Sequence, residues 1–273
     1  MHRRLFDLPA IIWPSRLDGE SDMGVTAIVQ ARMGSSRFPG KSLRKLAGKP
    51  VVMHVVERAL ATHNINTVVV ATSIKREDDC LAELLSAEGI KVCRGDERNV
   101  LSRYAAAARD VGGDPIVRLT GDDPLKDPEV MAKVINAFLQ EPDRFDYVSN
   151  TIKPTFPEGQ DTEVIRASCL FEAERLAVDS YDREHVTPFF YNHPEKYRCF
   201  NVSHEEDLSH MRWTLDNEQD FRFLEAVFAQ LNDQRPSMQQ VLTLLRQKPE
   251  LMKINQTVPR SDRYFDLPGQ VLQ

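Results

Sequence analysis

The stretch VTAIVQARMGSSRFPGKS, residues 25–42, decides the fold. Its first five residues are apolar or β-branched, which predicts a short strand buried on both faces. A loop with glycines, serines and cations at Arg32, Arg37 and Lys41 follows the strand directly. In open α/β sheets, ligands bind beyond the carboxyl ends of the strands, so this loop is the first place to look for a site.

Strand and helix patterns alternate from this stretch to residue 148. We expect further strands at residues 67–71, 90–93, 116–119 and 145–148, and helices at 50–60, 77–88, 99–111 and 127–139. Alternation of this length predicts parallel βαβ units, and therefore an α/β fold with an open, mostly parallel Rossmann-like sheet. Beyond residue 150 the rhythm weakens, and we expect strands at 162–165 and 211–215 and helices at 167–178, 184–191 and 217–231.

The composition limits the class of protein. The 273 residues carry a formal charge of −6 and are 41% hydrophobic, as in a globular protein with an ample core. The acidic balance argues against nucleic-acid binding, and no apolar run reaches the roughly 18 residues of a membrane span. The four cysteines lie far apart without a C-x-x-C pair, so we expect no zinc ribbon, no disulfide framework and a cytoplasmic location.

The two ends of the chain lack the periodicity of the rest. Pro9, Pro14 and Arg16 interrupt the apolar stretch that a secretory signal would need. We therefore expect residues 1–22 to be a disordered extension or the result of a start site placed too early, and residues 256–273 to be a tail. One domain should occupy residues 23–255, in two halves at 23–150 and 151–255.

Positive charge is concentrated after the first strand. Between Arg32 and Lys49 there are six basic residues and no acidic one. Glycine and serine amides can wrap an anion that Arg and Lys neutralise, so we interpret the loop as a triphosphate cradle; an ordinary solvated loop is the alternative. It is not a Walker P-loop, because five residues, not four, separate Gly34 from Gly40, and no G-x-G-x-x-G fingerprint is present.

Carboxylates follow two later predicted strands. Asp122 and Asp123 come after Gly121, and Asp216 comes after residues 211–215. Adjacent carboxylates repel one another unless a cation lies there, and hard oxygen ligands suit Mg²⁺; a simple turn before Pro124 is the alternative. Opposite a basic cradle, Asp122 and Asp216 predict a Mg²⁺ site for phosphoryl or nucleotidyl transfer.

Residues 31–41 closely resemble the opening motif of the SpsF-type (spore-coat polysaccharide biosynthesis) cytidylyltransferases, relatives of the CMP-sialate and CMP-3-deoxy-manno-octulosonate (Kdo) synthetases. The resemblance continues in order to about residue 255, through residues 70–72, 94–96, 99–104, 118–125, 147–150, 183–188, 193–195 and 208–212, and Asp216. It implies the fold of the nucleotide-diphospho-sugar transferases. It also implies transfer of CMP from CTP to a sugar acid or related sugar with release of pyrophosphate, for surface polysaccharide or glycan biosynthesis.

The resemblance also implies roles for particular residues. Catalysis falls to Arg32, Arg37, Lys41, Asp122 and Asp216, of which Asp122 and Asp216 would hold Mg²⁺. Nucleotide binding falls to Ala31, Arg32, Met33, Gly34, Lys41, Thr72, Arg94, Asn99, Arg103 and Asp122, so residues 23–150 are the predicted nucleotide-binding half.

The predicted acceptor half is residues 151–255. For the acceptor sugar we expect Glu158, Asp161, Glu163, Arg183, Glu184 and His185; a solvated turn and an exposed helix start are the alternatives. The relatives and the aromatic residues 189–191 suggest a homodimer.

Three other functions stay open at this point. The loop chemistry also fits a nucleotidyltransferase that uses another nucleoside triphosphate, or a non-catalytic nucleotide-binding protein. A GT-A-type glycosyltransferase on the same fold is a further alternative, but that class typically has a D-x-D strand end, and Asp122 and Asp123 are adjacent.

Overall fold

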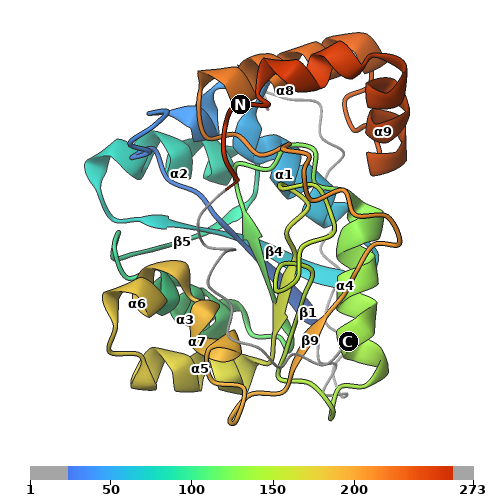
Figure 1. Ribbon diagram of the computed structural model, residues 1–273. Helices are drawn as coiled ribbons and strands as arrows, with labels where there is room; N and C mark the ends of the chain where they lie inside the picture. The colour runs from blue at the N-terminus through green and yellow to red at the C-terminus, as the bar shows by residue number, and fades with distance from the viewer. Residues whose placement is uncertain (1–23, 261–273) are drawn as a thin grey trace.

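The computed structural model describes residues 24–260. The predicted extension at residues 1–22 and all but residues 256–260 of the predicted tail lie outside the described part. Within the described residues a seven-stranded sheet forms the centre, with the strand order β5-β4-β1-β6-β8-β7-β9 (Figure 1). Its strands are β1 (Val25–Gln30), β4 (Ile65–Ser73), β5 (Lys91–Gly95), β6 (Ile116–Thr120), β7 (Tyr147–Ser149), β8 (Glu163–Ile165) and β9 (Cys199–Asn201).

The pairing confirms the predicted fold class. β8 is antiparallel to its neighbours β6 and β7, and every other neighbouring pair in this sheet is parallel. The chain leaves β1 for β4 on one side and later returns to β6 on the other. The connections therefore diverge between β1 and β6, which is where open α/β sheets form their ligand crevice.

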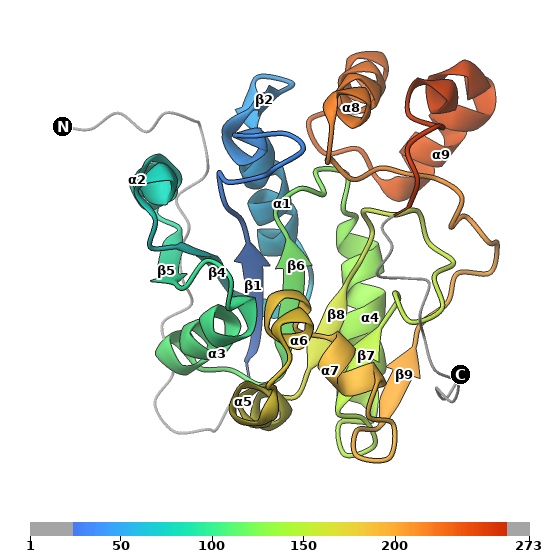
Figure 2. The same ribbon diagram turned by 60° about the vertical axis from the view of Figure 1, so that its left-hand side comes forward.

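Helices cover both faces of the sheet. On one face α1 (Val51–Leu60), α2 (Asp79–Ala87) and α4 (Pro128–Gln140) share a core with alternate residues of β1, Val25, Ala27 and Val29. On the other face α3 (Val100–Val111), α5 (Ala167–Leu176) and α7 (Pro188–Tyr191) pack with Ile28. The β1 side chains are thus buried on both faces of the sheet, as the apolar sequence of β1 predicts. Figure 2 shows α3, α5, α6 (Ser180–His185) and α7 together in front of the sheet.

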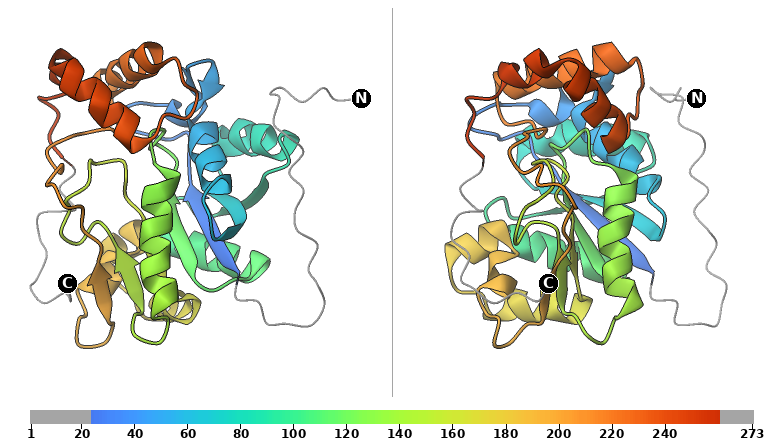
Figure 3. Two further views of the ribbon diagram at one scale, coloured as in Figure 1. Left: turned by 90° about the vertical axis from the view of Figure 1, so that its right-hand side faces the viewer. Right: turned by 45° about the vertical axis from the view of Figure 1, so that its right-hand side comes forward.

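A third core lies at the end of the sheet toward which β1 and β6 point (Figures 2 and 3). It joins α8 (Glu218–Leu231) and α9 (Met238–Gln247) to Leu46 of the hairpin β2 (Lys45–Leu46) and β3 (Lys49–Pro50). Short 3-10 turns are η1 (Lys41–Leu43), η2 (Arg76–Asp78) and η3 (Pro249–Ile254). No helix in the described part is both long and apolar enough to cross a membrane.

Two sequence predictions of secondary structure are wrong. Residues 211–215 are not a strand; they run extended between two loops, with a single bridge between Glu158 and Arg212 and a 2.9 Å bond from the Leu215 amide to the Asp122 carbonyl. The helix expected at 184–191 is split into α6 and α7. Val186 has a positive φ of 69°, which ends α6. Pro188 has no amide hydrogen to continue an earlier helix but suits the first turn of α7.

Candidate active site

A pocket of about 330 Å³, here called the strand-end pocket, lies beyond the ends of β1 and β6. It is lined by the last residues of these two strands and those that follow them, Gln30 to Arg32 and Thr120 to Asp122. Gly121 allows the two strand ends to approach, because a Cβ atom there would lie 2.9 Å from both the Cβ of Ala31 and the carbonyl oxygen of Gln30. The pocket therefore occupies the crevice expected from the strand order.

Lys41 is the central cation of this pocket. The loop after β1 ends at Gly40, whose left-handed φ of 74° turns the chain into η1 and brings Lys41 inward. The Lys41 ammonium donates to Asp122 Oδ2 at 2.7 Å, to Asp216 Oδ1 at 2.9 Å and to the Leu215 carbonyl at 2.7 Å. Burial alone would lower the pKa of Lys41, but the two carboxylates outweigh it and the pKa is raised. Lys41 is therefore a fixed positive charge.

Asp216 is paired with three cations. Besides Lys41, Arg37 lies 3.0 Å from Asp216 Oδ2, and Arg212 donates to the same oxygen at 2.9 Å. Burial would raise the pKa of Asp216, yet the charges of Lys41 and Arg37 hold it well below its usual range. The aspartate is thus ionised at any physiological pH and is a poor proton acceptor.

The backbone of the predicted phosphate loop is partly used within the protein. The Met33 amide donates to Asp78 Oδ1 at 2.6 Å. The amides of Ser35 and Gly40 both donate to the Met33 carbonyl. The side chains of Arg32, Arg37 and Lys41, together with Ser35 and Ser36, line the pocket. Neither Met33 nor Gly34 forms part of the pocket wall.

The residues predicted for the base and ribose are divided by the structure. Arg103 lines the pocket, is 2% exposed, donates to the carbonyls of Asp96 and Glu97, and has a pKa that burial lowers. Asn99 caps α3 through the Ser102 amide. Arg94 donates to the carbonyls of Ser73 and Lys75, and Thr72 is fully buried. These last three residues are placed around the pocket rather than in its wall.

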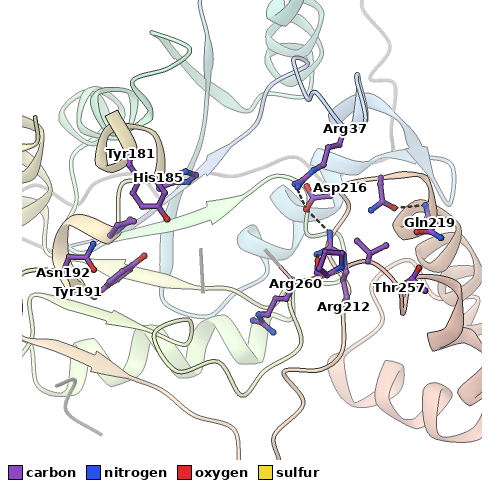
Figure 4. Close-up of a pocket in the computed structure, with 14 residues that line it drawn as sticks. Arg37, Tyr181, His185, Tyr191, Asn192, Arg212, Asp216, Gln219, Thr257 and Arg260 are labelled. Carbon is purple, nitrogen blue, oxygen red and sulfur yellow. Dashed lines mark hydrogen bonds and ion pairs between the residues drawn. The ribbon is translucent and has the colours of Figure 1, made fainter. Parts of the chain in front are cut away.

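A second and larger pocket of about 940 Å³, here called the outer pocket, adjoins the first. Arg37, His185 and Asp216 line both. The remaining wall comes from α6, α7, Arg212, the start of α8 and residues 257–260. Figure 4 shows Tyr181, Tyr191, Gln219, Thr257 and Arg260 among these residues. A molecule in the outer pocket would lie directly next to one in the strand-end pocket.

Of the residues predicted to bind the acceptor, three line the pockets. Glu158 and Glu184 face the strand-end pocket, and His185 lies where the two pockets meet. Glu163 instead lies within the sheet, where it pairs with Arg118 and accepts from the Tyr147 hydroxyl at 2.7 Å. Two further predicted residues, Asp161 and Arg183, are outside both pocket walls. The Asp161 carbonyl accepts from the buried ammonium of Lys126, which fixes that loop.

Sequence reasoning assigned no role to several residues that the structure places in or beside the site. Arg118 lines the strand-end pocket from β6 and donates to Gln30 Oε1 at 3.1 Å. Arg212 and Arg260 line the outer pocket. Asp78 is fully buried and holds the phosphate loop through Met33. The sequence could have pointed to Arg118, because it is a charged residue in an otherwise apolar strand. No sequence motif surrounds Arg260, so nothing in the sequence pointed to it.

Asp122 and Asp216 are the two sheet-edge carboxylates that could hold a divalent cation beside Lys41. Both carboxylates reach one point, the Lys41 ammonium, from two separate segments at the same edge of the sheet. Asp122 is the more accessible, with 26% of its side chain exposed against 15% for Asp216. No group of three or more acidic, histidine or cysteine ligands occurs in the described residues. Mg²⁺ suits such a sparse set, because it keeps several waters and bridges substrate phosphates.

A basic loop and a carboxylate pair at the ligand edge of this sheet define an α/β nucleotidyltransferase. The chain belongs to the cytidylyltransferase family, whose model matches residues 26–256. It is 34% identical over 232 residues to the spore coat polysaccharide biosynthesis protein SpsF of Bacillus subtilis, covering 82% of this chain and 94% of SpsF. The confirmed resemblance makes this protein an enzyme of the nucleotidyltransferase class.

Solved structures agree with the fold. A cytidylyltransferase from Leptospira borgpetersenii superposes with a TM-score of 0.82 at 30% identity, over 87% of this chain and all of that one (100%). A CMP:2-keto-3-deoxy-manno-octonic acid synthetase complexed with CTP superposes with a TM-score of 0.58 at 20% identity, over 76% of this chain and 99% of that one. The second similarity supports the fold alone.

Proposed function

We propose that this protein transfers the cytidylyl group of CTP to a hydroxyl of a sugar acid, releasing pyrophosphate and forming a CMP-sugar for surface polysaccharide or glycan biosynthesis. The observation that carries the proposal is the Lys41 ammonium held in the strand-end pocket between Asp122 and Asp216, of which Asp216 also lines the outer pocket. CTP would occupy the strand-end pocket and the sugar the outer pocket. SpsF, the relative from B. subtilis, carries a name from polysaccharide biosynthesis, which supports this role for the product.

The chemical step is a substitution at the α-phosphorus of CTP. The acceptor oxygen forms the new P–O bond, the bond to the pyrophosphate oxygen breaks, and the acceptor hydroxyl loses its proton. Arg32, Arg37 and Lys41 would neutralise the charge that develops on the α-phosphate and on the leaving pyrophosphate. Fixed cations suit this role, because they need no reorganisation during the reaction.

The proton of the acceptor needs a base. Asp216 is poorly suited, because its pKa is held well below the usual range. His185 lines both pockets, so its imidazole lies at the boundary across which the acceptor oxygen must approach. We assign the proton to His185.

Asp122 and Asp216 would hold Mg²⁺, which supplies charge neutralisation and orients the triphosphate when it is bound. Asp122 would supply the more accessible oxygens. Asp216 would contribute one carboxylate that the surrounding cations already keep ionised.

The outer pocket supports an anionic acceptor. Its wall holds three arginines, Arg37, Arg212 and Arg260, against one carboxylate, Asp216. Arg212 is neutralised by Glu158, Asp216 and Asp220, so binding of an acceptor carboxylate falls to Arg37 and Arg260. Tyr181 and Tyr191 add aromatic faces and hydroxyls that suit a sugar ring. A sugar with a carboxylate therefore fits this wall better than a neutral one.

Pyrophosphate release tests the proposal. The full chain is incubated with MgCl₂ and CTP, UTP, ATP or GTP, with a panel of sugar acids and a neutral hexose as control. We expect release with CTP and a sugar acid only. Release with another nucleotide would replace CTP as the substrate. Turnover of a nucleotide sugar without pyrophosphate would indicate a glycosyltransferase, and nucleotide binding without any turnover a binding protein. The homodimer and the cytoplasmic location stay predictions of the sequence.

A further inference from the structure

Arg212 is the most heavily engaged side chain near the site, and it belongs to a segment that carries no regular structure. Its side chain is 8% exposed. Nε and Nη2 bind the two oxygens of Asp220, each at 2.9 Å. Nη1 donates to Glu158 Oε2 at 2.7 Å, and Nη2 also donates to Asp216 Oδ2 at 2.9 Å. One guanidinium thus joins three carboxylates.

All five N–H groups of the guanidinium have a use in this arrangement. The fifth acceptor is the carbonyl oxygen of Pro259, 3.4 Å from Nη1. An arginine has five donors in a fixed planar fork, and a lysine has three donors around a point charge. The shape of this network therefore requires arginine, and lysine cannot replace it without losing contacts.

The network fixes Asp216 from two sides. Asp220, which is fully buried in the first turn of α8, accepts from the Asp216 amide at 2.9 Å while it binds Arg212. Asn255 donates to Asp220 Oδ1 at 3.1 Å and to the Arg212 carbonyl at 3.0 Å. Asp220 therefore holds the backbone amide of Asp216, and Arg212 holds its carboxylate. Asn255 and Pro259 are bound to the same pair of residues. Figure 4 shows Arg212 below Asp216, on the side away from Arg37.

We infer that Arg212 is a positioning residue for the reaction, which sets the direction in which Asp216 presents its carboxylate to Lys41 and to the Mg²⁺ that Asp122 and Asp216 would hold. The inference rests on the proposed function, because it assigns Asp216 to the site of Mg²⁺ and CTP. Arg212 does not act on the substrate phosphates, since its donors are engaged by protein acceptors. Asp216 follows a segment that is not a strand, so Arg212 supplies the fixed position that pairing in a sheet would otherwise give.

The experiment measures how strongly Mg²⁺ tightens the binding of CTP. Calorimetric titrations of CTP with and without MgCl₂ are made on the full chain and on Arg212→Lys. Mg²⁺ should lower the Kd of wild type for CTP. In Arg212→Lys the ratio of the Kd without Mg²⁺ to the Kd with Mg²⁺ should be about tenfold smaller than in wild type, a size expected for a supporting residue of a metal site. Binding of CMP, which lacks the bridging phosphates, should change less than about threefold, since a mutated neighbour alters few CMP contacts.

A double variant separates positioning from general structural damage. If Arg212 acts through Asp216, Arg212→Lys should remove nothing further from the Mg²⁺ effect once Asp216→Asn is present. Arg198→Lys is the matched control, because Arg198 also binds one carboxylate, Asp146, through Nε and Nη2 but lies outside both pocket walls. It should leave the Mg²⁺ effect unchanged.

Each outcome decides the inference. A full Mg²⁺ effect in Arg212→Lys, or losses that simply add in the double variant, would overturn the positioning role and leave the proposed function intact. A wild type in which Mg²⁺ does not tighten CTP binding would overturn the proposed metal site and the positioning role together. Should Arg212→Lys fail to fold, Asp220→Asn is used instead. It weakens the contact between Arg212 and residue 220 with little change in side-chain shape, and the same loss of the Mg²⁺ effect is expected.

Discussion

The strand-end pocket and the outer pocket share Arg37, His185 and Asp216, but the protein builds them in different ways. The first rests on residues that follow β1 and β6 directly, so the sheet itself sets their positions. The second is assembled from two short helices, the start of α8 and residues 257–260. Topology determines the pocket proposed for CTP, whereas the packing of irregular segments determines the pocket proposed for the acceptor.

This difference predicts that the two halves of the reaction can be separated by mutation. Lys41 and Asp122 line only the strand-end pocket, and Arg260 lines only the outer one. Changes at the first two should lower the rate of the chemical step. A change at Arg260 should alter the use of the acceptor.

The largest effect is expected for Lys41→Ala. It removes the ammonium that is ion-paired with both Asp122 and Asp216. We expect kcat for pyrophosphate release to fall about a thousandfold, the upper range for removing one fixed donor from a transition state. Steady-state kinetics with CTP and the acceptor measure it. Lys45→Ala, an exposed lysine in β2, is the control that should retain activity. A rise in acceptor KM alone would contradict the phosphate role of Lys41.

Asp122→Asn should have the next largest effect. The amide keeps the shape of the side chain but is a poorer ligand for Mg²⁺, so we expect activity to fall about a hundredfold. The fold should be retained, because Asp122 is partly exposed at a strand end. Pyrophosphate release as a function of MgCl₂ concentration and a thermal melt measure the two quantities. Asp110→Asn, at an exposed pair with Lys91, is the control. Activity close to that of wild type would remove Asp122 from the metal site.

The same difference explains what the sequence could predict. The alternation of apolar runs and amphipathic helices predicts β1, β4, β5, β6 and the helices between them, and the rule for strand ends then brings Lys41 and Asp122 together. Each step uses local periodicity plus one topological rule. The α/β class and the meeting of Lys41 with Asp122 could therefore be predicted from the sequence.

The second half offers no such rule. Met211 to Leu215 looks like a strand because it is apolar and extended, yet it pairs with the loop around Glu158. Glu163 looks like a polar site residue, but β8 inserts antiparallel beside β6 and so places it opposite Arg118. Pairing of this kind depends on which strand is the neighbour, and a sequence pattern does not contain that information.

Arg260 tests the outer pocket. Arg260→Gln removes one of its three positive charges while the side chain stays polar. We expect the acceptor KM to rise about tenfold, or about 1.4 kcal/mol, with the KM for CTP unchanged. Initial rates at varied acceptor with saturating CTP, and at varied CTP with saturating acceptor, measure the two KM values. Arg246→Gln, an exposed arginine paired with Glu206, is the control. An equal change in both KM values would show that the two pockets are not independent.

The smallest effect on catalysis is expected from His54, which lies in neither pocket wall and supports the third core. Its ring lies 5.0 Å from that of Phe228, and Nε2 is 2.8 Å from the Leu46 carbonyl. Burial, and then the charges of Lys49 and Arg58, lower its pKa to about 4. The unfolded chain therefore takes up a proton on His54 more readily than the folded one. The stability from the neutral ring is present above the unfolded pKa of about 6.5 and is lost as the pH falls toward the folded value.

At pH 5.5 this loss should reach about 1.4 kcal/mol relative to pH 7.5, since the unfolded form gains about that much per pH unit below its pKa. Urea unfolding at the two pH values measures it. In His54→Leu that part of the pH dependence should vanish, whereas His63→Leu, at an exposed position, should keep it. The kinetic constants at pH 7.5 should stay as in any folded control, because both pockets are built without His54. The same pH dependence in wild type and His54→Leu would show that the third core does not depend on this neutral ring, and a changed KM for either substrate would show that it supports the pockets.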